Sequence, residues 1–393
     1  MIDYADPANS LRKYYSRSLS ADSKRLHFAA HSHHLWPDCT RDAHLKAWDD
    51  SAQFADEKYG AWFAQAAQAR AHLARLVGGA SAEQFVLGSN THEFLVRILS
   101  CATPGEPFRV LTTDGEFHSF SRQMRRCEEV PGFTVERVPV EPFETFPKRW
   151  AAACKHGCDF AYLSHVFFNS GYALSDLPIF VDPLPTSATV VVDGYHAVCA
   201  IPVSIEGLQK RIFYVGGGYK YAQAGEGACY LYVPEENQSR PLNTGWFASF
   251  GALEKGEAKV TYDRGGARFA GATFDFTATY RFNAVQNWWN SIGLTVNAVH
   301  GRVQALKAQF VQEIDQAGLR TLRSDQLLKC NGQTLDGHFL AFRLPNAVAL
   351  AEKLKSEKIV VDARADRLRF GFGLYHDREM VSQLVERLKN GGY

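Results

Sequence analysis

Lys220 stands in a glycine-rich segment that could hold a reactive amine. The segment reads Val215-Gly-Gly-Gly-Tyr-Lys220-Tyr-Ala-Gln-Ala-Gly-Glu-Gly227 and follows an apolar run typical of a strand. Glycines let the backbone turn tightly, and flanking aromatic side chains can shield a lysine from water. Desolvation lowers the pKa of a lysine, and the neutral amine is a nucleophile. The other interpretation is a surface lysine in an ordinary glycine-rich turn.

Asp193 ends a second apolar run, Thr189-Val-Val-Val-Asp193-Gly-Tyr-His196. A carboxylate at the C-terminal edge of a buried strand lies where doubly wound sheets bind their ligands. Pyridoxal phosphate requires such an acid, because a protonated pyridine nitrogen makes its ring an electron sink. Asp193 together with Lys220 therefore indicates a pyridoxal-phosphate site, whereas Asp193 alone would also fit a cap on the next turn.

Two further strand ends carry residues that suit the same cofactor. Segment 87–93 leads from a strand into a helix, and free N–H groups at a helix N-terminus bind phosphate. We expect Thr91 and His92 at this phosphate site, although a plain helix cap with Glu93 in the first turn gives the same pattern. Phe117 follows another strand, where it could stack on the cofactor ring or belong to the core.

The apolar runs also predict the elements that position these residues. Seven short β-rich runs alternate with helical stretches, at residues 85–87, 109–112, 133–135, 160–163, 189–192, 212–215 and 228–233. This alternation indicates an α/β fold, in which a large domain has a mainly parallel seven-stranded sheet between helices. After about residue 260 the pattern is that of a smaller C-terminal α+β domain. We expect an N-terminal segment (1–60) that packs on the small domain, a large domain (61–260) and the small domain (261–393).

Composition narrows the function classes. The 393 residues include 43 Lys+Arg and 42 Asp+Glu, so the net charge of +1 gives no electrostatic drive toward nucleic acid or anionic membrane. No apolar run reaches the roughly 18 residues of a spanning helix, and the first residues lack the apolar core of a signal peptide. We therefore expect a cytoplasmic protein without nucleic-acid or membrane partners. The 8 cysteines contain no C-x-x-C pair, so we expect no metal site.

Taken in order, these segments resemble the class V aminotransferases, which are fold-type-I pyridoxal-phosphate enzymes, and most closely the kynureninases. The resemblance covers the chain from about Phe28 to Tyr375. Its strongest matches are Asp193-x-x-His196, Tyr219-Lys220-Tyr221, Asn243-Thr-Gly-Trp246-Phe247 and Leu368-Arg369-Phe370-Gly-Phe372.

The resemblance implies a set of residues around the cofactor ring. Lys220 would bind the cofactor covalently. Asp193 would face the pyridine nitrogen, with His196 beside it, and Phe117 would stack on the ring. Tyr219 falls at a position that contacts the phosphate, and its place beside Lys220 would also let it relay a proton.

The resemblance also implies roles at the edges of the site. Thr91 and Trp246 fall at positions that approach the phosphate. Thr273 falls where a residue reaches across a dimer interface, so we expect a homodimer. Arg369 matches the arginine that binds the α-carboxylate of an amino-acid substrate, and Phe274 could line a pocket for the substrate side chain.

The reaction implied is hydrolysis of the Cβ–Cγ bond of kynurenine or a related γ-oxo amino acid, giving alanine and an acid, as in tryptophan catabolism. The alternatives are a class V aminotransferase, another pyridoxal-phosphate lyase or epimerase, and a non-catalytic protein that binds the cofactor. Cysteine desulfuration is less expected. Desulfurases of this group carry a cysteine shortly before the carboxylate-binding arginine, and residues 360–369 contain none.

The chain departs from the kynureninase pattern at the expected substrate end. Ala30-His31-Ser-His33-His34 stands where the family has Gly-Asn-Ser-Leu-Gly, and Phe120 replaces an aspartate. The three histidines could donate to a carbonyl or carboxylate of the substrate. They could equally be structural residues of a loop.

Overall fold

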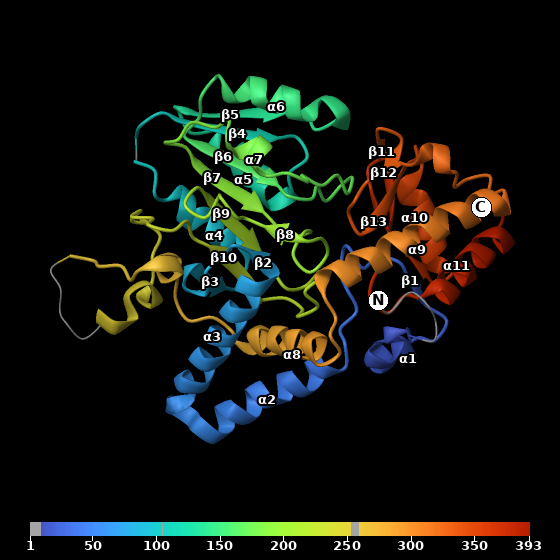
Figure 1. The fold of residues 1–393 in the computed structure, drawn as a ribbon, viewed down its shortest axis with the longest axis horizontal. Coiled ribbons are helices and arrows are strands. Elements are labelled where there is room, and N and C mark those ends of the chain that lie inside the picture. Colours follow the sequence, from blue (N-terminus) through green and yellow to red (C-terminus); the bar gives the residue numbers. More distant parts are fainter. Residues whose placement is uncertain (1–8, 104, 253–258) are drawn as a thin grey trace.

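The computed structural model describes residues 9–103, 105–252 and 259–393. A seven-stranded sheet with the order β3-β10-β9-β7-β6-β4-β5 forms its centre (Figure 1). Its strands are β3 (Phe85–Gly88), β4 (Phe108–Thr113), β5 (Phe133–Val138), β6 (Phe160–Ser164), β7 (Thr189–Asp193), β9 (Ile212–Gly216) and β10 (Cys229–Tyr232). Only β10 runs antiparallel to its neighbours. All seven predicted runs are strands of this sheet, so the expected α/β fold is confirmed.

Helices cover both faces of the sheet, which explains why its central strands are apolar throughout. Val190 and Val192 of β7 belong to one core, whereas Val191 between them belongs to the core on the opposite face. This alternation is the two-residue period of a strand. The helices in this part are α4 (Thr91–Leu99), α5 (His118–Cys127), α6 (Phe146–Cys154) and the short α7 (Pro178–Val181).

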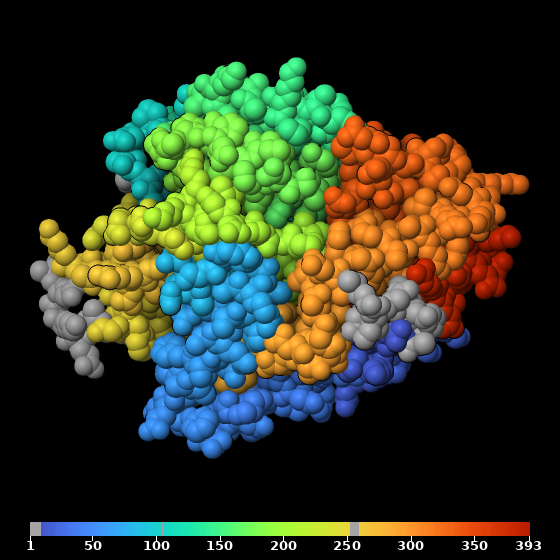
Figure 2. Space-filling model, in the orientation of Figure 1, coloured from blue at the N-terminus to red at the C-terminus, as the bar shows by residue number. Residues whose placement is uncertain are grey.

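Two long N-terminal helices extend along one side of the sheet. They are α2 (Cys39–Phe54) and α3 (Lys58–Leu76), and both pack against α8 (Thr277–Ser291) from the C-terminal half of the chain. Figure 2 shows these blue and orange segments side by side on the surface. Gly293, with a φ of 65°, separates α8 from α9 (Val296–Ala317). The chain turns between these two helices where glycine adopts the left-handed conformation.

The smaller C-terminal part contains a three-stranded antiparallel sheet, in the order β13 (Phe339–Arg343), β16 (Arg367–Gly371), β15 (Asp362–Arg364). Helices α9, α10 (Ala347–Ser356) and α11 (Arg378–Asn390) pack around this sheet and its neighbours. Near the N-terminus, β1 (Leu26–His27) pairs in parallel with β14 (Ile359–Val360), and Ala29 bridges to Gly371. Residues 26–29 therefore lie on the C-terminal part, while the domain limits at 60 and 260 stay a prediction.

Short elements complete the described chain. They are α1 (Ser16–Ser20), β2 (Val77–Gly78), β8 (Val203–Ser204), β11 (Lys329–Cys330) and β12 (Gln333–Thr334). Within residues 9–103, 105–252 and 259–393, no helix combines the length and the apolar character needed to cross a membrane.

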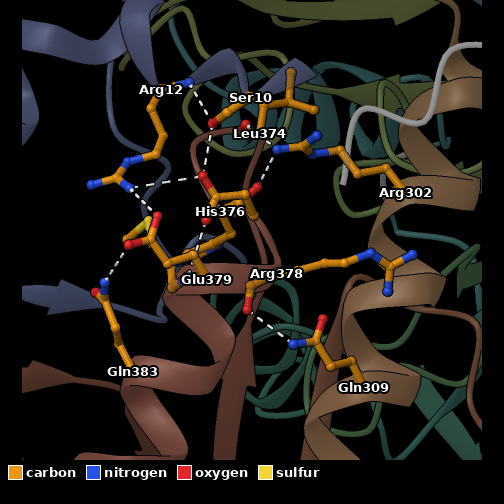
Figure 3. A network of polar contacts seen from close by, with 11 residues as sticks. Ser10, Arg12, Arg302, Gln309, Leu374, His376, Arg378, Glu379 and Gln383 are labelled. Carbon is orange, nitrogen blue, oxygen red and sulfur yellow. Dashed lines mark hydrogen bonds and ion pairs between the residues drawn. The ribbon is translucent and has the colours of Figure 1, made fainter. Parts of the chain in front are cut away.

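Polar contacts from distant segments fix the turn after β16 (Figure 3). Arg302 of α9 donates to the carbonyl oxygens of Leu374 and His376. From the N-terminal segment, Ser10 Oγ donates to Asp377 Oδ2 at 2.8 Å, and the Asp377 side chain also caps α11. The turn between β16 and α11 is therefore held by two distant parts of the chain at once, α9 and the N-terminal segment.

Candidate active site

The C-terminal ends of the parallel strands bring the candidate residues to one edge of the large sheet. Asp193 is the last residue of β7, where it pairs with Ser164 of β6 and Val215 of β9. Lys220 follows β9, and Phe117 lies between β4 and α5. This is the edge at which open α/β sheets bind ligands.

The glycines before Lys220 are required by close packing. A Cβ atom on Gly217 would lie 2.4 Å from the hydroxyl oxygen of Tyr195 and 2.5 Å from Cys229 Sγ. Only a residue without a side chain lets this segment pass so close to the sheet. The glycine-rich sequence therefore places Lys220 against the strand ends.

A cavity of about 400 Å³ opens at this edge, a size typical of cofactor sites. Seven of the residues expected from the sequence line it, namely Thr91, His92, Phe117, Asp193, His196, Tyr219 and Lys220. Further lining residues were not predicted, among them Ser89, Asn90, Ser119, Ser164, Phe168, Tyr195, Glu226 and Cys229. Several of these also follow strand ends, so the same sequence signal could have found them.

Lys220 is buried, with 5% of its surface exposed. Its Nζ atom lies 2.6 Å from Nε2 of His196, and the rings of Tyr195 and Phe117 surround it at 4.8 and 5.2 Å. Burial lowers the pKa of Lys220 to about 7, although the Asp193 carboxylate opposes this shift. Near neutral pH much of the amine is therefore uncharged, which is the state that attacks a carbonyl.

Asp193 is held rigidly at the bottom of the cavity. Its Oδ1 accepts from the backbone N–H of Tyr195 at 2.9 Å, and its Oδ2 accepts from the Tyr162 hydroxyl at 2.8 Å. Burial raises the pKa of Asp193, and these hydrogen bonds and the Lys220 charge oppose the rise. A cationic ring nitrogen beside this carboxylate would stabilise its charged form.

His196 offers a free hydrogen-bonding atom to a ligand. Its Nδ1 is buried and has no hydrogen-bond partner among the described residues. Burial holds the pKa of His196 well below its usual value, so the ring is neutral. A buried polar atom of this kind is costly unless a ligand supplies its partner.

The N-terminus of α4 forms one end of the cavity. Asn90 caps the helix, because its Oδ1 accepts from the Glu93 N–H at 2.9 Å. The helix cap is therefore present, and Thr91 and His92 line the cavity in the first helical turn, where the phosphate site stays a prediction. The positive end of the helix dipole favours an anion there.

Arg369 lies behind the wall of the cavity on β16, with 3% of its surface exposed. Its guanidinium donates to the carbonyl oxygen of Phe168, which lines the cavity, and to the Asp362 carboxylate. Its Nε is buried and has no partner among the described residues. Sequence reasoning missed Asp362, which is the cross-strand neighbour of Arg369.

His31 joins this same group of charged residues. It is 1% exposed, stacks on Phe339 at 4.6 Å, and places Nε2 3.7 Å from Asp362 Oδ2. Neither ring nitrogen makes a hydrogen bond within the described chain. His31 thus lies beside Arg369, and both of its ring nitrogens could hydrogen-bond a ligand.

The other two histidines point elsewhere. His34 hydrogen-bonds the Leu35 carbonyl oxygen through Nδ1 at 2.7 Å and accepts from the Leu374 N–H through Nε2 at 3.3 Å. These backbone contacts use both nitrogens in fixing the loop. His33 is exposed and stacks on Tyr219 at 5.4 Å, at the rim of the cavity.

Seven residues expected at the site do not line this cavity: Arg369 and the three histidines described above, and also Trp246, Thr273 and Phe274. Trp246 stacks on Phe247 at 4.4 Å, Phe274 stacks on Phe276 at 4.3 Å, and Thr273 is exposed. The role of Thr273 across a dimer interface stays a prediction, as do the contacts of Trp246 with the phosphate and of Phe274 with the substrate.

The sequence matches the aminotransferase class-V family over residues 55–384. This chain belongs to that family. Class V enzymes use pyridoxal phosphate, so the cofactor prediction is confirmed. A comparison with curated proteins finds no significant match.

Solved structures of other proteins share the whole fold at low identity. A mutant of C-DES with glycine linked covalently to pyridoxal phosphate is 18% identical, with a TM-score of 0.81 over 96% of this chain and 99% of that one. The cystine C–S lyase C-DES with its product cysteine persulfide is 19% identical, with a TM-score of 0.77 over 93% and 97%. A cysteine desulfurase from Thermococcus onnurineus is 17% identical, with a TM-score of 0.76 over 95% and 96%. The predicted fold type I is confirmed, and these structures give the kynureninase resemblance no support.

The side chains around the cavity fit pyridoxal phosphate. A buried amine, a carboxylate at a strand end, an aromatic ring and a helix N-terminus face one cavity, and His196 Nδ1 needs a partner there.

Across the described ranges, no group of three or more histidine, cysteine or acidic side chains is arranged to hold a metal ion.

Proposed function

We propose that this class V enzyme is a pyridoxal-phosphate-dependent lyase that releases a group from Cβ of an α-amino acid. The observation that carries the proposal is the buried amine of Lys220, which shares one cavity with Asp193 and lies near the guanidinium of Arg369. This combination can attach the cofactor, balance its charge and bind an amino acid.

Residues of this chain would hold each part of the cofactor. Lys220 would bind it covalently, Asp193 would face the pyridine nitrogen, and Phe117 and His196 would contact the ring. Thr91 and the N-terminus of α4 would bind the phosphate. When bound, pyridoxal phosphate supplies an electron sink that stabilises negative charge at the substrate Cα.

The protein's own side chains then orient the substrate and move its protons. Arg369 binds the α-carboxylate and so fixes the direction of the Cα–H bond. Lys220 Nζ takes the proton from Cα. Burial raises the pKa of Tyr219 to about 12, so its hydroxyl keeps its proton and can donate it to the departing group.

Cleavage of a C–S bond is our first candidate. The similar structures named above include a C–S lyase and a cysteine desulfurase. A desulfurase thiol is missing from residues 360–369. Cys229 lines the cavity, but burial raises the pKa of its thiol to about 11, so it is a poor sulfur acceptor. We therefore infer elimination, which leaves pyruvate and ammonium, rather than sulfur transfer to the enzyme.

Hydrolysis of a Cβ–Cγ bond is the second candidate. The motifs around Lys220, Asp193 and Arg369 resemble those of kynureninases. His31, with both ring nitrogens free of hydrogen bonds among the described residues, could donate to a γ-carbonyl oxygen.

The first test is covalent attachment of the cofactor. We expect purified protein with pyridoxal phosphate to be yellow, and borohydride reduction should fix the cofactor on the peptide that contains Lys220. Lys220→Ala should abolish this labelling, whereas Lys210→Ala on the surface should not. Labelling that survives in Lys220→Ala would disprove the assignment.

The second test identifies the products. Cystine, S-alkyl cysteines, kynurenine and 3-hydroxykynurenine are supplied without any keto acid, and products are measured by mass spectrometry. Pyruvate with a thiol or persulfide supports elimination, and alanine with an aromatic acid supports the second candidate. Turnover only after addition of 2-oxoglutarate or pyruvate would show a transaminase instead.

A further inference from the structure

Glu116 is a carboxyl buried in the wall behind the cavity. It lies in the turn between β4 and α5, directly before Phe117, and only 3% of its surface is exposed. Three donors reach its carboxyl group: Thr113 Oγ1 at 2.6 Å, Ser164 Oγ at 2.6 Å and the Ser164 N–H at 3.2 Å. Ser164 itself lines the cavity, so Glu116 touches the site through this one hydroxyl.

The surroundings of Glu116 favour its neutral form. The ionisable groups that face it are Asp193 on β7 and Tyr162 on β6, and no ion pair to Glu116 occurs in the described part of the chain. Burial raises the pKa of Glu116 to about 8 and the Asp193 carboxylate adds to the rise, against the hydrogen bonds from Ser164 and Thr113. Two buried acids that lie close together are rarely ionised at once.

The hydrogen bonds show where the proton of neutral Glu116 must be. Oε1 accepts from the Ser164 N–H and from the Thr113 hydroxyl, whose oxygen in turn accepts from the Gly115 N–H at 3.2 Å. Among the described residues, Oε2 contacts Ser164 Oγ alone, and this hydroxyl donates to it when Glu116 is ionised. In neutral Glu116 a proton on Oε2 would leave both donors to Oε1 in place. Ser164 Oγ would then accept a hydrogen bond from Oε2–H, and its own hydrogen would be free to point into the cavity that Ser164 lines.

We propose that Glu116 and Ser164 form a pH-switched hydrogen-bond donor in the cavity wall, which acts on an anionic oxygen of the bound cofactor. The inference rests on the proposed cofactor site, because Ser164 pairs with Asp193 across the sheet and therefore lies beside the ring position. With neutral Glu116, Ser164 donates into the cavity. With ionised Glu116, the Ser164 hydroxyl donates to the carboxylate and presents only lone pairs to the ligand. Glu116 is thus a positioning residue that acts through Ser164.

Three variants separate this role from a structural one. Glu116→Gln places an N–H donor against Ser164 Oγ at every pH, so it locks the donating state. Ser164→Ala removes the hydroxyl but keeps Glu116. Thr113→Val is the matched control, because it removes the other hydroxyl bound to Glu116 and leaves Ser164 in place.

The first measurement uses the protein without cofactor. Infrared spectra should show a protonated carboxyl at pH 7 that ionises with a midpoint near the pKa of about 8. This band should be absent from Glu116→Gln and retained in Ser164→Ala. A band that survives in Glu116→Gln, or no protonated carboxyl in the wild type, would overturn the inference.

The second measurement follows the absorbance of bound cofactor against pH. Wild type should show a spectral step near pH 8, and Thr113→Val should keep the step but at a higher pH, because the hydrogen bond from Thr113 lowers the pKa of Glu116. The step should disappear in Glu116→Gln and in Ser164→Ala. If Glu116→Gln does not fold, the spectrum of Ser164→Ala tests the inference alone, and a spectral step that persists in this variant would contradict it. Loaded wild type and variants with one common pH response would contradict this inference alone. A wild-type protein that takes up no cofactor would contradict the proposed function, and the inference with it.

Discussion

Replacing Arg369 by lysine tests the carboxylate site directly. The guanidinium of Arg369 donates to Asp362 and to the Phe168 carbonyl oxygen, and these two contacts hold the planar group in one orientation. Its Nε has no hydrogen-bond partner among the described residues. Lysine keeps the charge but loses the fork. Weakening a buried charged contact costs about 2–4 kcal/mol. Because 1.4 kcal/mol is a factor of ten, the affinity for an amino acid should fall by about 30- to 700-fold.

The assay compares two ligands of cofactor-loaded enzyme by the change in cofactor absorbance. L-Alanine carries the carboxylate and ethylamine lacks it. Arg369→Lys should therefore weaken the binding of alanine strongly and the binding of ethylamine by less than about threefold. Arg367→Lys is the matched control, because Arg367 lies two residues away on β16, is 8% exposed and pairs with Glu141 at 2.8 Å instead. Equal losses for the two ligands, or unchanged affinity for alanine, would place the carboxylate site elsewhere.

Three further predictions concern other residues. Because burial lowers the pKa of Lys220 to about 7, uptake of pyridoxal phosphate by the cofactor-free protein should accelerate as pH rises through about 7, and a midpoint near 10 would contradict this. In Gly371→Ala the new Cβ would lie 2.1 Å from His31 Nδ1, so the free energy of unfolding measured in urea should fall by about 1–3 kcal/mol. Gly301 lies inside α9, and a Cβ added there would have no neighbouring atom within 4 Å, so Gly301→Ala should instead raise the free energy of unfolding by about 0.5–1 kcal/mol. Light scattering should show a homodimer, and an active monomer at micromolar concentration would refute the role expected for Thr273.

Sequence reasoning predicted the large sheet well, because its strands are buried on both faces and stand out as apolar runs. The same runs located Lys220 and Asp193, since parallel strands place their C-terminal ends together. Both residues line the cavity, although their chemical roles stay proposals.

Contacts between distant segments could not be predicted from the sequence. Asp362 meets Arg369 only through the register of β15 and β16, a pairing that no local pattern reveals. The buried contact of Glu116 was not predicted, because it is made with Ser164 from another strand. His31 and His34 are near neighbours in the chain, yet packing sends one toward Arg369 and the other to backbone partners. Side-chain direction in such a loop is decided by tertiary contacts.

The pairing of β1 with β14 has a consequence for synthesis of the chain on the ribosome. Leu26 and His27 leave the ribosome more than 300 residues before their partners Ile359 and Val360. At about 5–20 residues per second, the segment that carries His31 must wait tens of seconds for the strand it joins. The large sheet can fold during this time, because its seven strands end at Tyr232. The Arg369 side of the site is therefore completed after the sheet, and a chain that stops before β14 would keep Lys220 but would lack both Arg369 and the strand that anchors the His31 segment.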